Sequence, residues 1–227
     1  TWWESTEWGA ESLIAHGIRT LGADGTDSAR FGDYPSLRNA AASLPLPGYT
    51  ATAAGAQQIR NRGTVCGSIA HADPSAELPL CLVALKGTVH LRSARGARQV
   101  PAHDFFTGLL STARRADELI EAVSFPRPVP GESFGFAEHS RRHGDFALCA
   151  VAAVVNAHGL RVAVGGLGDR PHACELPSLS GAALDEELNE LAWSLDVRDD
   201  PHTSAATRRH LLRHLARQAI QQARRQT

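Results

Sequence analysis

Three apolar segments in the second half of the chain constrain its fold more than any other feature. They are residues 133–140 (SFGFAEHS), 147–159 (ALCAVAAVVNAHG) and 160–168 (LRVAVGGLG). Each has the length and the enrichment in Val, Phe and small residues that are typical of a β-strand, and the three follow one another closely. The second half of the chain is therefore expected to contain three strands in sequence.

Two helices are expected to close the chain, over residues 183–195 and 203–226, with Thr203 or Ser204 as the cap of the second. The second helix is rich in basic residues, which could suggest nucleic-acid binding. It also has an apolar stripe at helical spacing, formed by Leu211, Leu212, Leu215, Ala219 and Ile220. The stripe favours a packed helix with its arginines on the solvent side, from Arg208 to Arg225. We therefore predict no nucleic-acid partner.

The first half of the chain mixes helices and strands. Helices are predicted over residues 9–17, 35–44 and 73–85, the last with Asp73 or Ser75 as a cap, and a short one within 103–112. Strands are predicted over residues 18–22 and 116–126, and residues 87–102 read as a β-hairpin that turns at Ala94, Arg95 and Gly96. The proline-rich residues 126–132 mark a boundary, which divides the chain into domains over 1–128 and 129–227.

The composition is that of an ordinary globular protein and excludes several classes. With 227 residues, 43% of them apolar, the chain can form one large domain or two small ones. A net charge of -1 provides no field that would attract nucleic acid or an anionic membrane. No apolar run reaches the ~18 residues of a membrane span, and the first residues lack the features of a secretory signal. We therefore predict a cytoplasmic protein without a membrane span.

Cysteine and histidine spacing argues against a metal centre in this chain. The four cysteines, Cys66, Cys81, Cys149 and Cys174, include no C-x-x-C pair, so neither a zinc ribbon nor an iron–sulfur cluster is expected. The last three are expected to be small buried apolar residues. The histidines show no H-E-x-x-H spacing, so we predict no catalytic metal.

Residues 57–78 (QIRNRGTVCGSIAHADPSAELP) are the least ordinary segment. Small residues in a turn before a helix let backbone N–H groups approach a phosphate closely, and Thr64 and Ser68 can add hydroxyl donors. Glu77 could accept a hydrogen bond from a ligand. The residues alone leave two interpretations equally open, a cradle for an anionic cofactor and a tight turn that packs a helix on a sheet.

The same segment, followed by residues 103–126 and by 141–155 (RRHGDFALCAVAAVV), resembles the FAD-binding medium subunit of the molybdenum hydroxylases. That family includes carbon monoxide dehydrogenase and xanthine dehydrogenase. The resemblance runs from about residue 57 to the C-terminus and implies an α+β fold. It implies an FAD-binding domain of the vanillyl-alcohol-oxidase type, whose first subdomain is reduced or incomplete. A C-terminal domain with a three-stranded antiparallel sheet and a helical bundle should follow.

The resemblance also implies the cofactor-binding residues. The family's Thr-aliphatic-Gly-Gly-Asn/Ser segment, which meets the FAD diphosphate and the flavin edge, matches Thr64, Val65, Cys66, Gly67 and Ser68. Cys66 replaces the usual glycine, which would cost on the order of 1 kcal/mol if the backbone has a positive φ there. Further contacts are implied at Glu77 and Ile120, at Gly25, Thr26 and Asp27 in an earlier loop that matches more loosely, and beside the flavin at Phe134 and Phe136.

The function implied by the resemblance is electron transfer. FAD in this chain would take electrons from iron–sulfur clusters in a small subunit, after substrate reacts at molybdopterin in a large subunit, and pass them to an acceptor. The three subunits would form a heterotrimer, commonly doubled to a dimer of heterotrimers, and this chain would hold no catalytic acid or base. Two alternatives remain open, a structural subunit that has lost FAD and a stand-alone flavoprotein reductase. The chain has no G-x-G-x-x-G segment to supply the nicotinamide site that such a reductase needs.

Overall fold

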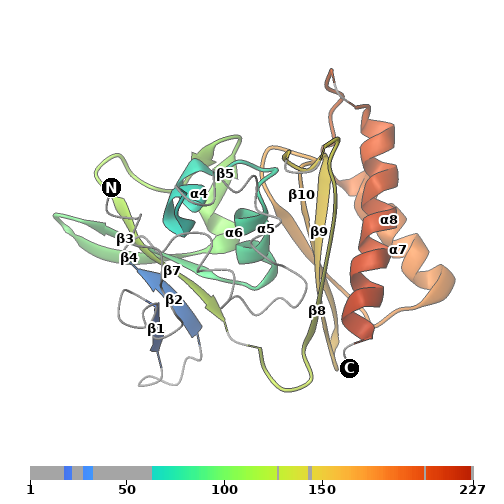
Figure 1. Ribbon diagram of the computed structural model, residues 1–227, viewed down its shortest axis with the longest axis horizontal. Helices are drawn as coiled ribbons and strands as arrows, with labels where there is room; N and C mark the ends of the chain where they lie inside the picture. The colour runs from blue at the N-terminus through green and yellow to red at the C-terminus, as the bar shows by residue number, and fades with distance from the viewer. Residues whose placement is uncertain are drawn as a thin grey trace.

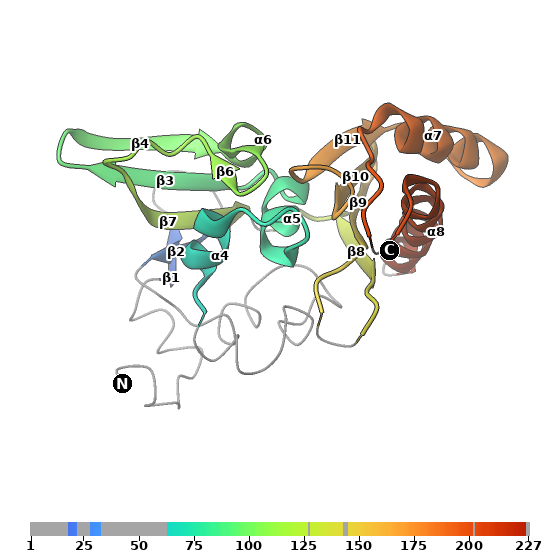
Figure 2. The same cartoon turned by 90° about the horizontal axis from the view of Figure 1, so that it is seen from above.

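The computed structural model describes residues 18–21, 28–32, 63–126, 128–142, 145–201 and 203–225, and for the first two ranges it describes only the course of the backbone (Figure 1). The helices predicted over residues 9–17 and 35–44 lie outside these ranges, as do Gly25, Thr26 and Asp27. The described part is mixed α/β. Its two larger sheets are both antiparallel, and they stand side by side with short helices between them (Figure 2).

The first sheet has five strands in the order β1-β2-β7-β3-β4, and every neighbouring pair is antiparallel. The strands are β1 (Ile18–Leu21), β2 (Ser28–Gly32), β3 (Thr88–Ser93), β4 (Gly96–Pro101) and β7 (Leu119–Pro126). The hairpin predicted over residues 87–102 is confirmed, and Gly96 supplies the positive φ, 136°, that its turn requires. The strands predicted over residues 18–22 and 116–126 are also confirmed, whereas β2 was not predicted.

The second sheet has four strands in the order β11-β10-β9-β8, again all antiparallel. They are β8 (Ser133–His139), β9 (Cys149–Asn156), β10 (Gly159–Gly165) and β11 (His172–Leu176). The first three are the predicted strands. The fourth, β11, was missed because its five residues (HACEL) do not alternate between apolar and polar side chains, and none of them is fully buried.

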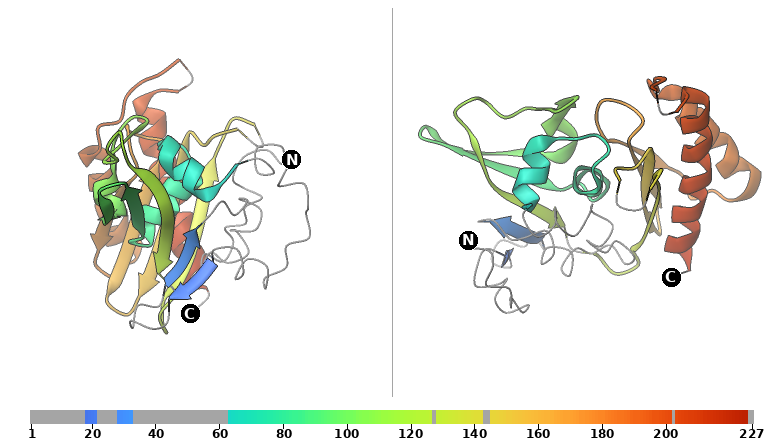
Figure 3. Two further views of the ribbon diagram at one scale, coloured as in Figure 1. Left: turned by 90° about the vertical axis from the view of Figure 1, so that its left-hand side faces the viewer. Right: turned by 45° about the horizontal axis from the view of Figure 1, so that its top comes forward.

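Two long helices cover the outer face of the second sheet, α7 (Gly181–Ser194) and α8 (Ala205–Arg224) (Figures 1 and 3). The Ser204 side chain accepts a hydrogen bond from Thr207 N, which confirms the predicted cap. Leu212, Leu215 and Ile220 of the predicted stripe are buried against the sheet. Arg217 pairs with Asp185 at 2.5 Å and so joins the two helices.

Arg208 departs from the prediction that the arginines of this helix face solvent. It is buried, and its guanidinium donates to the carbonyl oxygens of Leu148 and Gly166 and pairs with Asp200. The two carbonyl oxygens belong to segments far from α8 in the sequence. A buried arginine is tolerated when it is paired and hydrogen-bonded in this way, and Arg208 thereby ties α8 to the end of the β9–β10 pair where β9 begins and β10 ends.

Three short helices belong to the first half of the described chain. They are α4 (Val65–His71), α5 (Glu77–Ala84) and α6 (Ala102–Phe105), and a small hairpin of β5 (Phe106–Gly108) and β6 (Ser111–Thr112) follows α6. The helix predicted over residues 73–85 is therefore confirmed as α5. Its predicted caps are wrong, because Ala76 holds the N-cap position and Asp73 Oδ1 instead accepts a hydrogen bond from Ser75 N at 2.8 Å.

Every residue of α5 is buried, because the helix lies between the two sheets (Figures 2 and 3). Leu78, Leu82 and Val83 belong to the apolar cluster that the first sheet shares. Leu80 and Ala84 pack on the second sheet, against a set of alanines: Ala147, Ala150, Ala152 and Ala163. A helix that is apolar on all sides is stable only when it is enclosed, and here each sheet covers one side.

Helix α8 approaches β8 so closely at Gly135 that a side chain there would collide with it. A Cβ at Gly135 would lie 1.9 Å from the carbonyl oxygen of Ala219. We expect Gly135→Ala to push α8 from the sheet and lower the free energy of unfolding by about 2 kcal/mol. Gly168→Ala is the matched control, because its Cβ would lie 3.6 Å from the nearest atom, Asp196 O. Urea denaturation of both variants checks this, and equal stability of the two would contradict the close packing.

Candidate functional site

The segment Thr64–Ser68 forms the first turn of α4 rather than the expected turn between a strand and a helix. Thr64 is the N-cap, and its Oγ1 accepts a hydrogen bond from Gly67 N at 2.9 Å. Its carbonyl oxygen accepts from Ser68 N at 3.0 Å. Because Cys66 is helical and has no positive φ, the backbone cost expected for a cysteine there does not arise.

The side chains of this turn point in different directions. Val65 is fully buried in the core, so only its backbone can meet a ligand. Gly67 is exposed, and Thr64 and Ser68 are half-buried. A Cβ at Gly67 would lie 2.8 Å from Thr64 Oγ1, so glycine leaves room for the cap. The turn therefore presents two hydroxyl groups and an accessible stretch of backbone on its outer side.

Cys66 and Ile120 line one cavity of about 390 Å³ between the start of α4, the β3–β4 hairpin and the start of β7. The prediction named both residues, although they come from different elements. The remaining lining residues are Arg92, Ser93, Ala94, Asp117, Leu119 and Glu121. The cavity thus has an apolar wall beside a polar rim, which is the usual make-up of a small-molecule site.

The charged residues of the rim are held in ion pairs. Arg92 Nε lies 2.6 Å from Glu121 Oε1, and Arg95 pairs with Asp117 at 2.7 Å. These rim residues were not predicted. From the sequence, Arg92 looks like an ordinary exposed residue of a strand. Only the pairing of β3 with β7 brings it beside the cavity.

A partly buried ion pair, between Arg98 on β4 and the buried Glu118, fixes the loop that leads into β7 and the cavity. Arg98 donates to both carboxylate oxygens of Glu118, at 2.6 and 2.8 Å, and also to the carbonyl oxygen of Ala113. The hydrogen bonds from Arg98 lower the pKa of Glu118 to about 2. Bidentate pairing of this kind gives a fixed geometry, so the residue before β7 is tied to β4 across the intervening strand β3.

Glu77 lies apart from that cavity, at the first position of α5. Its side chain is buried, and burial raises its pKa from 4.5 to about 7. Asp73 and Glu138 raise the pKa further by repulsion, whereas a hydrogen bond from its own backbone N–H lowers it. Sequence reasoning named Glu77 but gave no sign of its burial between the two sheets.

Phe134 and Phe136 lie on β8, away from the cavity that Cys66 and Ile120 line. Phe134 is buried in the core cluster, and Phe136 packs against it while only half-buried. Their placement agrees with packing roles. Contact with a flavin remains a prediction for both.

The cysteines have the character of packed apolar residues. Burial raises the pKa of Cys149 to about 12 and that of Cys174 to about 11, and the pKa of Cys81 is raised as well. A thiol protonated at neutral pH is a poor nucleophile and a poor metal ligand. Residues 63–126, 128–142, 145–201 and 203–225 contain no cluster of His, Cys, Asp or Glu that could hold a metal ion.

Comparison with known proteins shows which family this chain resembles. A family profile described as "FAD binding domain in molybdopterin dehydrogenase" matches residues 20–128. The nicotine 6-hydroxylase medium subunit of Paenarthrobacter nicotinovorans is 39% identical over 73% of this chain, and the match covers 62% of that subunit. This chain therefore spans less than two thirds of that relative.

Two other matches cover more of the chain. The 6-hydroxypseudooxynicotine dehydrogenase complex subunit alpha of the same organism is 31% identical over 94% of this chain and 74% of its own length. A carbon monoxide dehydrogenase structure from Hydrogenophaga pseudoflava superposes with a TM-score of 0.83, at 22% identity, over 92% of this chain and 77% of that chain. This superposition shows that our chain and the carbon monoxide dehydrogenase chain share a fold.

The buried carboxyl of Glu77 should make stability depend on pH. Between pH 4.5 and about 7 the folded chain holds a proton that the unfolded chain releases, so the free energy of unfolding falls as pH rises through this window. The full penalty above pH 7 is roughly 3 kcal/mol, at about 1.4 kcal/mol for each pKa unit. Glu77→Gln should therefore be more stable than the natural chain at pH 8, and by much less at pH 5.

Chemical denaturation at the two pH values measures this difference. The matched control is Glu186→Gln, an exposed position on α7. A Glu77→Gln difference that stays the same from pH 5 to pH 8 would show that the carboxyl is not buried as described.

Proposed function

This chain belongs to the family of FAD-binding medium subunits of the molybdenum hydroxylases, and from that premise we propose that it carries FAD as the electron-transfer subunit of such an enzyme. The observation that carries the proposal is the cavity between Cys66 and Ile120. It opens beside the first turn of α4, within the segment that matches the FAD-binding profile.

The residues of this region fit an FAD molecule. A cavity of about 390 Å³ is within the range of small-molecule sites and has the apolar wall that a flavin ring requires. The hydroxyl groups of Thr64 and Ser68 can donate hydrogen bonds to an anionic group, and the absence of a side chain at the exposed Gly67 lets that group come close. FAD, when bound, would supply the redox chemistry, because none of these side chains can accept electrons.

We propose a role for each part of the site. Cys66 and Ile120 would pack on the flavin and exclude water, while Thr64, Gly67 and Ser68 would orient the diphosphate. Val65 would contribute only its backbone. A contact between Glu77 and the cofactor remains a proposal from the family resemblance alone, because Glu77 is buried apart from this cavity. Gly25, Thr26 and Asp27, in segments outside the described residues, remain proposed contacts from the sequence.

The partners follow from the family. We propose that a large subunit holds molybdopterin and a small subunit holds the iron–sulfur clusters, with the trimer doubled to a dimer of heterotrimers. Electrons would pass from the clusters through FAD to an acceptor. We also propose that the division into domains falls between β7, which ends at Pro126, and β8, which begins at Ser133.

The compartment we propose is the cytoplasm. All four cysteines are free thiols, as is usual in a reducing compartment. Among the described residues, none of the helices has both the length and the apolar character that crossing a bilayer demands.

Filling the cavity from its rim tests the FAD proposal against its two alternatives. Ala94 is exposed in the turn of the β3–β4 hairpin and lines the cavity, so Ala94→Trp should occupy the space with little effect on folding. We expect this variant to bind FAD at least about tenfold more weakly, because the indole competes with the flavin ring. The absorption of bound flavin at visible wavelengths provides the readout.

Ala97→Trp is the matched control, because Ala97 is exposed on β4 of the same hairpin but does not line the cavity. A natural chain that binds no FAD would favour the structural subunit that has lost its cofactor. A chain that binds FAD and also reacts with a nicotinamide nucleotide alone would favour the stand-alone reductase. Equal FAD affinity in both tryptophan variants would place the flavin elsewhere.

A further inference from the structure

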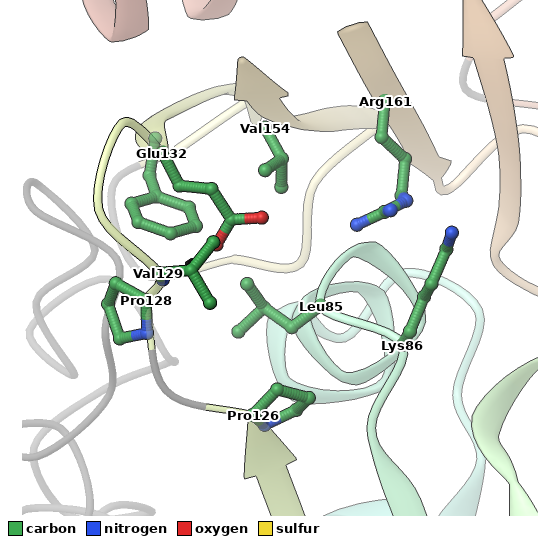
Figure 4. A pocket seen from close by; sticks show the side chains of 9 residues that line it. Leu85, Lys86, Pro126, Pro128, Val129, Glu132, Val154 and Arg161 are labelled. Carbon is green, nitrogen blue, oxygen red and sulfur yellow. Dashed lines mark hydrogen bonds between the residues drawn. The ribbon is translucent and has the colours of Figure 1, made fainter. Parts of the chain in front are cut away.

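A second cavity lies at the seam between the two sheets (Figure 4) and shares no lining residue with the cavity of Cys66 and Ile120. Its volume is about 200 Å³. The lining residues come from the end of α5, the end of β7, the segment before β8, and strands β8, β9 and β10: Leu85, Lys86, Pro126, Pro128, Val129, Glu132, Phe134, Val154 and Arg161. The function proposed above makes no use of this cavity.

One side of the cavity is cationic. Arg161 is 14% exposed, and Nε donates to Glu175 while Nη1 donates to the carbonyl oxygen of Ala84, the last residue of α5. Lys86 Nζ pairs with the same Glu175 carboxylate at 2.8 Å. Two cations thus share one carboxylate, and no group of the described residues accepts a hydrogen bond from Arg161 Nη2. This side of the cavity therefore keeps a positive charge and a free donor.

Lys86 holds its place with an unfavourable backbone conformation. Its φ is +54°, a left-handed value that favours glycine, and it directly follows the residue that caps the C-terminus of α5. Glycine occupies the next position, Gly87, where a Cβ would lie 2.2 Å from a Leu82 methyl group. Lys86 N donates to the carbonyl oxygen of Val83 at 3.1 Å, and Gly87 N donates to that of Leu82 at 2.8 Å. The left-handed residue thus closes α5 in a common helix-ending motif, which places the Lys86 side chain at the rim of the cavity.

The opposite side of the cavity is anionic. Figure 4 shows the carboxylate of Glu132 turned into the cavity from one side and the guanidinium of Arg161 from the other, with Leu85 and Val154 between them. Glu132 Oε2 accepts a hydrogen bond from Val129 N at 3.2 Å, which fixes the carboxylate in its turn. Oε1 is left for a ligand that carries a donor.

The size and the polarity of the cavity together define the ligand. An apolar cavity of about 150 Å³ holds one benzene molecule, so about 200 Å³ admits one ring with small substituents. We propose that this cavity binds a monocyclic zwitterion, with its carboxylate on Lys86 and Arg161, its protonated amine on Glu132, and its ring against Leu85, Phe134 and Val154. Such a ligand would contact both sheets at once and would stabilise the folded chain.

Three probe compounds separate the contributions. 4-(Aminomethyl)benzoate has both charges, benzoate has only the carboxylate, and benzylamine has only the amine. Calorimetric titration of the full chain should show the first binding at least about tenfold more tightly than either of the others, because each charged hydrogen bond adds to affinity. The thermal midpoint of unfolding should rise most with 4-(aminomethyl)benzoate and less with benzoate or benzylamine.

Two variants assign the charges. Glu132→Gln keeps an acceptor for Val129 N and should weaken 4-(aminomethyl)benzoate and benzylamine without weakening benzoate. Lys86→Gly relieves the left-handed backbone, so it should remain folded while it weakens 4-(aminomethyl)benzoate and benzoate. Glu186→Gln, on the exposed face of α7, should change nothing.

Several results would overturn the proposal. One is the absence of binding by all three probes at concentrations up to about 10 mM. Another is equal binding of 4-(aminomethyl)benzoate and benzoate, which would leave a simple anion site. A third is unchanged affinity in both Glu132→Gln and Lys86→Gly, which would place the ligand elsewhere on the chain.

Discussion

The complete burial of α5 between the two sheets is the constraint on which the rest of the structure depends. An eight-residue helix that is apolar on every side has no stability of its own, so it requires both sheets in place. Alanines on β9 and β10 let it come close on one side, and larger aliphatic and aromatic residues enclose it on the other. Each sheet in turn buries one face on α5, so the two sheets form a single packed unit through it.

Two charged side chains, Arg161 and Glu77, lie at the two ends of α5, and the burial of those ends explains their positions. Polar groups at a buried helix end need partners. At the C-terminal end Arg161 satisfies the carbonyl oxygen of Ala84, and this places its guanidinium in the second cavity. At the N-terminal end Pro74 O accepts from Gly166 N, and Glu77 is buried there with a raised pKa. The C-terminal end of α5 therefore presents a cation to a cavity that a ligand can fill, and the N-terminal end carries a carboxyl that titrates near neutral pH.

The sequence was sufficient where local patterns decide the structure and insufficient where distant groups do. Alternation and an Ala-Arg-Gly turn predicted the β3–β4 hairpin, and the stripe around Leu212 predicted α8. The burial of Arg208 could not be predicted in the same way, because two of its acceptors, Leu148 O and Gly166 O, lie just before β9 and just after β10. Small residues around Cys66 suggested a turn, yet Thr64 caps a helix there. Family resemblance, rather than any pattern, paired Cys66 with Ile120.

The central claim is that this chain serves as the FAD-carrying medium subunit of a molybdenum hydroxylase. Native purification of the assembly that contains the chain, followed by analysis of its molybdenum, its flavin and its polypeptides, tests that claim most directly. The account predicts that flavin and molybdenum both travel with this chain and two further subunits through size-exclusion chromatography. A native chain that elutes as a monomer, with neither flavin nor molybdenum, would contradict it.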